Sequence, residues 1–141
     1  EIRDAAVADL PGIFAIYNRE VEEGIATFDV EPRVAGVDDA WLTARATEHP
    51  VLVAADGDGA VIGWASIGPW SPRGAYRRTG EVSVYVDAAA RGRGVGSALL
   101  SALIERALAH TGGRRIEAAT LLGIGRNTLT RKVQELKIDA K

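Results

Sequence analysis

The stretch Glu81-Val82-Ser83-Val84-Tyr85-Val86, followed four residues later by Arg91-Gly92-Arg93-Gly94-Val95-Gly96, decides the fold of this chain. The first run is rich in β-branched and aromatic residues and predicts a strand. The second run is a glycine-rich turn, and the amphipathic segment after it predicts a helix that reaches His110. The apolar residues of that helix fall in two neighbouring columns: Val95, Leu99, Leu103 and Ala107, and then Leu100, Ile104 and Leu108. Strand, turn and helix in this order predict an α/β protein.

The glycine-rich turn has the chemistry of a diphosphate cradle. Closely spaced glycines let backbone N–H groups face outward, and the free N–H groups and dipole of the helix start favour a negative charge. Arg91 and Arg93 add formal positive charge. The spacing is neither a Walker loop nor G-x-G-x-x-G. The glycines could equally serve close packing of the helix on the strand.

The rest of the first hundred residues alternates further strands and helices. We expect a short strand at 2–6, a helix opening at Asp9-Leu10-Pro11 and ending at Gly24, a loop at 26–32 and a second helix at 38–48. Strands at 51–55 and 60–67 flank the hairpin turn Asp56-Gly57-Asp58-Gly59, and a loop follows at 68–79.

Composition excludes several classes of protein. The 141 residues are 47% hydrophobic and 26% charged, values typical of a globular chain. With no Cys, disulfides and thiol catalysis are excluded, and two His residues are too few for a His-rich metal site, so no metal is expected. No apolar run approaches the roughly 20 residues of a membrane helix. The first residues have no signal-peptide character, so we expect a cytoplasmic protein without membrane partners.

Charge is distributed unevenly along the chain. Residues 114–141 hold seven Lys and Arg against three Asp and Glu, a net charge of +4. Residues 1–113 hold ten Lys and Arg against sixteen Asp and Glu, a net charge of −6. A basic end on an acidic body suggests an attached nucleic-acid module, although a solvated basic helix face would give the same count.

The strand and glycine turn resemble the fourth strand and third helix of the Gcn5-related N-acetyltransferases (GNAT), in the phosphinothricin and methionine-sulfoximine acetyltransferase branch. Ile16-Tyr17-Asn18-Arg19-Glu20-Val21 with Gly24-Ile25-Ala26-Thr27-Phe28 is similar to that branch's first helix and substrate loop, and Gly63-Trp64-Ala65-Ser66 to its third strand. The resemblance covers roughly residues 2–110.

This resemblance implies acetyl-CoA as co-substrate and a small amine as acceptor. Amides of Gly92 to Ser97 would hold the pyrophosphate, and the backbone of 84–86 would pair with the pantetheine arm. Glu81 would act as general base, through water, because a protonated amine has no lone pair. The implied binding residues are Val84, Tyr85, Val86, Arg91, Gly92, Arg93, Gly94, Val95, Gly96 and Ser97. The branch usually has His after this Glu, whereas this chain has Val82, which puts substrate positioning or proton handling in doubt.

The end of the chain has a different pattern. After Thr111-Gly112-Gly113, a short helix at 114–122, the turn Gly123-Ile124-Gly125 and a last helix capped by Asn127 are expected. We place Ile116, Ala119 and Leu122 on the inner side of the short helix, and Leu129, Val133 and Leu136 on that of the last one. Roughly residues 97–138 resemble the Fis-type helix-turn-helix of nitrogen-regulator proteins, which implies a homodimer and DNA contact through 114–137. The expected DNA-facing residues are Arg126, Asn127, Thr128, Thr130, Arg131 and Lys132. Alternatively, 115–120 is a fifth strand followed by one helix.

Both resemblances include residues 97–110, so one helix would be shared. We therefore expect a chimera, engineered or recombined, of an acetyltransferase part at 1–96 and a Fis-type part at 97–141. The fold would be a truncated mixed sheet with flanking helices, continuing into an all-α helix-turn-helix. The fourth strand would then have an open edge, and acetyl transfer by a monomer would be weak or absent. A DNA-binding homodimer and a chimera with neither activity are the alternatives.

Overall fold

A four-stranded sheet forms the centre of the protein in a computed structural model that describes residues 1–23, 36, 39–45, 48–69 and 80–138. The strands are β1 (Ile2–Asp4), β2 (Val51–Ala55), β3 (Val61–Pro69) and β4 (Gly80–Val86), in the order β1-β2-β3-β4. Every pairing among these described strands is antiparallel, rather than the mixed sheet we expected. A parallel neighbour requires a crossover that returns to the sheet, and the crossover after β4 leads into helices instead.

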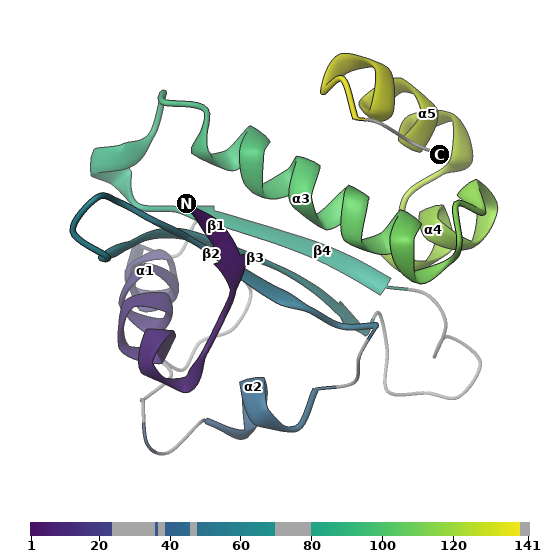
Figure 1. Ribbon diagram of the computed structural model, residues 1–141. Coiled ribbons are helices and arrows are strands. Elements are labelled where there is room, and N and C mark those ends of the chain that lie inside the picture. Colours follow the sequence, from purple (N-terminus) through teal and green to yellow (C-terminus); the bar gives the residue numbers. More distant parts are fainter. Residues whose placement is uncertain (24–35, 37–38, 46–47, 70–79, 139–141) are drawn as a thin grey trace.

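Helices cover both faces of the sheet (Figure 1). On one side lie α1 (Leu10–Glu23), which follows a 3-10 turn at Val7–Asp9, and the short α2 (Ala40–Thr43). On the other side lie α3 (Val95–His110), α4 (Arg115–Leu122) and α5 (Arg126–Glu135). A second 3-10 turn, Ala88–Ala90, joins β4 to the glycine turn before α3.

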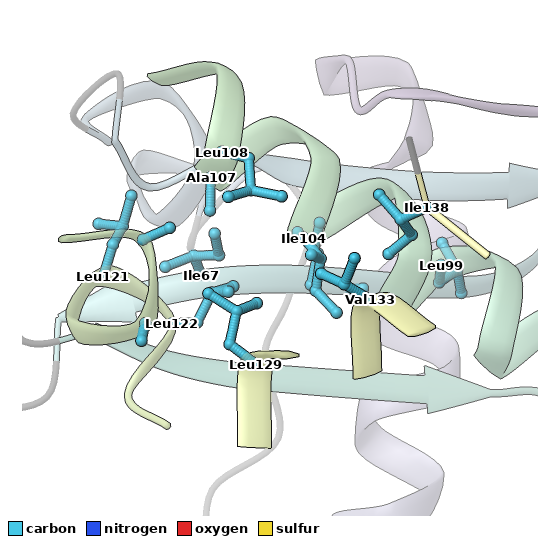
Figure 2. Packing of buried hydrophobic residues seen from close by; sticks show 14 of the residues in the cluster. Ile67, Leu99, Ile104, Ala107, Leu108, Leu121, Leu122, Leu129, Val133 and Ile138 are labelled. Carbon is cyan, nitrogen blue, oxygen red and sulfur yellow. The ribbon is translucent and has the colours of Figure 1, made fainter. Parts of the chain in front are cut away.

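The α3 side of the sheet holds the larger core. Leu99, Leu103 and Ile104 of α3 are fully or almost fully buried, as the amphipathic columns predict. They belong to one cluster with Ile67 of β3 and with Leu129 and Val133 of α5, part of which Figure 2 shows. The two C-terminal helices are therefore packed into the same core as the sheet.

Two predicted boundaries are wrong. The helix expected at 38–48 is four residues long, because Ala44 leaves the helical conformation at φ −96° and ψ 10° and the Arg45 side chain bonds nearby carbonyl oxygens. The strand expected at 2–6 ends at Asp4, before the turn that starts α1. The helix end at Gly24 and the loop at 26–32 lie outside the described residues, as does most of the loop at 68–79.

The C-terminal segment forms two helices, and the alternative of a fifth strand at 115–120 is wrong. Helix α4 ends at Gly123, whose φ of 74° allows Ile124 N–H to bond Ala119 C=O and close the helix end. Helix α5 is capped by Gly125 rather than Asn127, because Leu129 N–H bonds Gly125 C=O and so starts the helix two residues earlier.

One inward-facing prediction in α4 is also wrong. Ile116 is 62% exposed, whereas Ala118, Ala119, Leu121 and Leu122 are buried. The helix turns its small residues and its last turn toward α3 and β4, and Ile116 lies on the far side of it.

Candidate functional site

The glycine turn between β4 and α3 leaves backbone donors open. Gly92 and Gly94 have φ of 83° and 78°, in the left-handed region that favours glycine. Gly94 caps α3, and Ala98 N–H bonds its carbonyl oxygen to close the first turn. The N–H groups of residues 95–97 consequently have no acceptor within the helix. A glycine cap has no side chain to occupy them.

The turn between β4 and α3 is exposed. Arg91, Gly92, Arg93, Gly94 and Ser97 are exposed, and Val95 and Gly96 are half-buried behind them. A Cβ added at Gly92 or Gly94 would meet no described atom within 4 Å, so no described residue packs on the turn at these two positions. The positive end of the α3 dipole lies at this turn, and the exposed Arg91 and Arg93 add formal positive charge to it; Arg91 Nε donates to Val86 O at 3.4 Å. The predicted residues 91–97 are thus brought together in one turn.

Two glycines at the start of α3 and in β3 serve close packing of the helix on the sheet, which was the alternative interpretation of the glycine-rich pattern. A Cβ at Gly63 of β3 would lie 3.1 Å from Leu99 Cδ1 and from Val95 Cγ1. One at Gly96 would lie 3.6 Å from Val86 Cγ2. Small residues at these two positions let the start of α3 lie directly on β3 and β4, which fixes the open turn at the end of β4.

The free edge of β4 presents the peptide groups of alternate residues. Asp87 N–H bonds Ile62 C=O, and residue pairs 85–64 and 83–66 continue that ladder at spacings of two. In an antiparallel ladder the N–H and C=O of intervening residues face away from the partner strand. Val84 and Val86 therefore point their peptide groups outward, whereas those of Tyr85 are directed to β3. Of the three residues expected to pair with a ligand's arm, Tyr85 therefore has its peptide groups on β3, and Val86 O accepts a hydrogen bond from Arg91 Nε at 3.4 Å.

Glu81 lies at the start of β4 and is exposed. It is the cross-strand partner of Gly68 and shares the α1-side face with Ser83 and Tyr85. Val82 lies on the opposite face, packed against the α3-side core. The valine that replaces the branch's usual histidine therefore points away from the Glu81 side chain.

The turn after α4 packs against the backbone that carries Glu81. A Cβ at Gly80 would collide with the Leu121 carbonyl, and one at Gly123 with the Gly80 carbonyl oxygen. The same Cβ at Gly123 would lie 3.6 Å from Glu81 Cα. Two glycines thus allow the end of α4 to cover the first residues of β4, so the edge that we expected to be open is covered at this end.

An aromatic group on the α1-side face was not anticipated from the sequence. Trp64 and Tyr85, which are cross-strand partners, stack with ring centroids 4.7 Å apart. Trp41 meets Trp64 edge-on at 5.3 Å, and Tyr17 meets Tyr85 at 5.9 Å. Trp64 Nε1 is buried and has no hydrogen-bond partner among the residues that the structure describes. Alternation along β3 and β4 could have indicated this shared face, but the contribution of α2 could not be found that way.

Arg45, also missed, connects α2 to the sheet. Its Nη2 donates to Ile67 O at 2.7 Å and its Nε donates to His49 O at 2.8 Å. The guanidinium lies 4.9 Å from the Trp41 ring centroid. Burial, with a smaller contribution from Arg45, lowers the pKa of His49, which Glu48 partly opposes. No short-range pattern in the sequence joins Arg45 to Ile67, which is 22 residues away.

The predicted DNA-facing residues lie along α5. Arg126, Asn127 and Arg131 are exposed, and Thr128, Thr130 and Lys132 are half-buried. Glu135 lies within 3.6 Å of Arg131 and 3.4 Å of Lys132, so part of the positive charge is compensated locally. Within the described ranges, no cluster of three or more His, Asp or Glu side chains could hold a metal ion. In the same part of the chain, every helix is too short or too polar to cross a bilayer.

Comparison with known proteins extends the resemblance further along the chain than residue 110. The profile of the acetyltransferase (GNAT) family matches residues 12–125, which includes α3 and α4. An L-methionine sulfoximine/L-methionine sulfone acetyltransferase of Pseudomonas paraeruginosa is 48% identical over 128 residues, covering 88% of this chain and 74% of the relative.

Solved structures agree on the fold. A ribosomal-protein-alanine N-acetyltransferase from Brucella melitensis superposes with a TM-score of 0.71 at 42% identity, over 78% of this chain and 68% of that one. A GNAT superfamily phosphinothricin acetyltransferase from Sinorhizobium meliloti, in complex with acetyl-CoA, superposes with a TM-score of 0.66 at 39% identity, over 75% of this chain and 58% of that one.

Proposed function

The chain belongs to the GNAT family of acetyltransferases, and from this premise we propose that it transfers acetyl from acetyl-CoA to the amine of a small amino-acid analogue. The observation that carries the proposal is the open turn at 91–97, placed at the end of a strand whose edge offers the peptide groups of Val84 and Val86. Relatives at 48% and 47% identity act on L-methionine sulfoximine and L-methionine sulfone, which indicates the acceptor class.

The residues of the turn and strand fit acetyl-CoA. The N–H groups at 95–97 and the charges of Arg91 and Arg93 would hold a diphosphate. The outward peptide groups of Val84 and Val86 would pair with the amides of the pantetheine arm, as a strand pairs with its neighbour. Acetyl-CoA supplies the activated acyl group, and this arrangement would place it beside β4.

Glu81 would supply the base. A substrate ammonium has no lone pair, so a proton must leave the nitrogen before it can attack a carbonyl carbon. Glu81 is exposed at the start of β4, where it can take that proton directly or through water. The close packing of Gly123 on Gly80 would fix the position of the Glu81 backbone relative to the rest of β4.

Steady-state kinetics with acetyl-CoA and L-methionine sulfoximine test this proposal. Glu81→Gln should lower kcat about 10²- to 10⁴-fold, the usual contribution of a general base, and leave acetyl-CoA binding within twofold. Glu105→Gln, at an exposed glutamate of α3, is the matched control. Unchanged kcat in Glu81→Gln would assign the base to another group.

A Fis-type helix-turn-helix at 97–141, sharing the helix at 97–110, is a second candidate function. It is favoured by α4 and α5 on either side of the left-handed Gly123, with Arg126, Asn127 and Arg131 exposed. On this proposal the chain is a chimera that binds DNA as a homodimer and transfers acetyl weakly or not at all.

DNA binding can be recognised by how its affinity depends on salt concentration. Affinity should fall steeply with salt, and Arg131→Gln should reduce the slope of log affinity against log salt by about one. Arg106→Gln, at an exposed arginine of α3 paired with Asp4 of β1, is the control. A monomer by light scattering, or an absence of retarded DNA at low salt, would remove this second function.

A further inference from the structure

We propose that Arg19 of α1 raises the affinity of the glycine turn for acetyl-CoA by neutralising Asp87, the acidic residue just ahead of that turn. This inference rests on the proposed acetyl-CoA site and adds a positioning residue from outside it, which acts through Asp87 and not on the co-substrate itself. Its starting point is an ion pair between residues 68 apart in the chain, in which Arg19 Nη1 lies 2.9 Å from Asp87 Oδ1.

Asp87 is the acidic residue nearest to the turn along the chain. From residue 86 to residue 98 the formal charges are those of Asp87, Arg91 and Arg93, so one carboxylate cancels half of the positive charge there. A diphosphate is attracted by the two guanidinium groups and repelled by the carboxylate. A cation that reaches the carboxylate from another element restores the attraction of this segment for an anion.

The backbone holds Asp87 close to the turn. Its N–H donates to Ile62 C=O at 2.9 Å, and its C=O accepts the Ala90 N–H at 2.8 Å. Arg91 Nε donates to the carbonyl oxygen of Val86, the residue before Asp87, at 3.4 Å. The first arginine of the turn therefore contacts the peptide unit that leads into Asp87. This places the carboxylate within the distance of about 10 Å over which charges interact at 0.1 M salt.

The Asp87 side chain is directed to Arg19 rather than to its own turn. Asp87 precedes the 3-10 turn Ala88–Ala90 at the cap position, where an aspartate ordinarily accepts a backbone N–H of that turn. Here the carboxylate makes no such bond, and its Oδ1 accepts from Arg19 Nη1 instead. The two side chains are 54% and 31% exposed. An ion pair this exposed contributes little to folding stability, so its charge can be changed in a folded protein.

Three variants separate an effect of charge from a mechanical one. Arg19→Gln removes the cation and leaves the Asp87 carboxylate charged, whereas Asp87→Asn breaks the same ion pair by removing the carboxylate. If charge decides, Arg19→Gln weakens acetyl-CoA binding, Asp87→Asn binds at least as tightly as the wild type, and the double variant recovers the wild-type affinity. Arg106→Gln, which breaks another exposed pair between distant residues, to Asp4, is the matched control.

Isothermal titration calorimetry with acetyl-CoA measures these affinities. A unit charge about 10 Å from a doubly charged diphosphate in water changes Kd roughly fourfold. We expect a rise of about that size in Arg19→Gln at low salt. It should shrink below twofold at about 1 M salt, where the screening length is about 3 Å. Arg106→Gln should stay within the error of the wild type at both salt concentrations.

Two results would overturn the inference and leave the proposed function in place. An equal loss of affinity in Asp87→Asn, or no recovery in the double variant, would mean that the ion pair only holds α1 against β4. Equal Kd values for the wild type and Arg19→Gln at low salt would mean that the Asp87 charge does not reach the bound diphosphate. A wild type that does not bind acetyl-CoA at all would instead refute the proposed function, and the inference with it.

Discussion

Replacing Leu129 with alanine tests whether α5 is part of the same folding unit as the sheet. Leu129 is fully buried and lies in the cluster that includes Ile67, Leu99 and Ile104 (Figure 2). Deleting a buried leucine side chain costs about 2–5 kcal/mol, from lost transfer free energy and the cavity left behind. The same change at Ile116, which is 62% exposed, should stay within about 0.5 kcal/mol.

The assay is urea unfolding followed by two signals. Tryptophan fluorescence reports on Trp41, Trp64 and Trp70, of which the first two lie on the face of the sheet opposite α5. Far-ultraviolet circular dichroism reports on the helices. With an m value of roughly 1.5–2 kcal/mol/M, Leu129→Ala should lower both midpoints together by about 1–3 M.

Coincident shifts would mean that the loss of one α5 side chain is transmitted through the core to the far face of the sheet. If the fluorescence midpoint stays in place while the dichroism loses an early fraction of its amplitude, α4 and α5 unfold as a separate unit. That outcome would refute the reasoning from the shared core.

Three further predictions follow from local geometry. Gly94→Ala should destabilise the protein by about 1 kcal/mol, because Ala is strained at a φ of 78°, and should weaken acetyl-CoA binding in a calorimetric titration; unchanged affinity would place the diphosphate elsewhere. Hydrogen bonds from Arg3 lower the pKa of Asp9, so the contribution of Asp9 to stability is present above the ordinary carboxyl pKa and is lost as pH falls through the lower pKa of the folded state. Asp9→Asn should therefore make the free energy of unfolding depend less on pH below about pH 4. An acid-unfolding curve identical to that of the wild type would contradict this. Lys137, two residues beyond the end of α5, has a φ of 55°. Lys137→Gly should therefore stabilise the protein by roughly 1 kcal/mol and raise its thermal midpoint, and a lower midpoint would show that the lysine side chain contributes more than the strain costs.

Local signals in the sequence were sufficient to predict most of the helices and strands. The alternation and β-branched content of 81–86, the hairpin turn at 56–59 and the two apolar columns of α3 each act over a few residues, and each element was found. Predictions failed where a distant contact decided the outcome. Helix α2 is short because Arg45 bonds carbonyl groups outside it, and Ile116 is exposed because α4 turns its alanines toward α3.

The candidate site divides in the same way. The turn at 91–97 is visible in the sequence because a strand, glycines at positive φ and a helix start are consecutive along the chain. The ion pair between Arg19 and Asp87 beside that turn is not visible, since its members are 68 residues apart and only the packing of α1 on the sheet brings them together.

By itself, the sequence determined the nature of each segment and the resemblance to one acetyltransferase branch, because helix and strand preferences and the chemistry of a glycine turn depend on neighbours within a few residues. Only the tertiary structure decided that the last two helices join the core beneath β4, that Val82 turns away from Glu81 and that Arg19 pairs with Asp87. These depend on side chains from distant segments packing without voids, which fixes register and facing through many contacts at once.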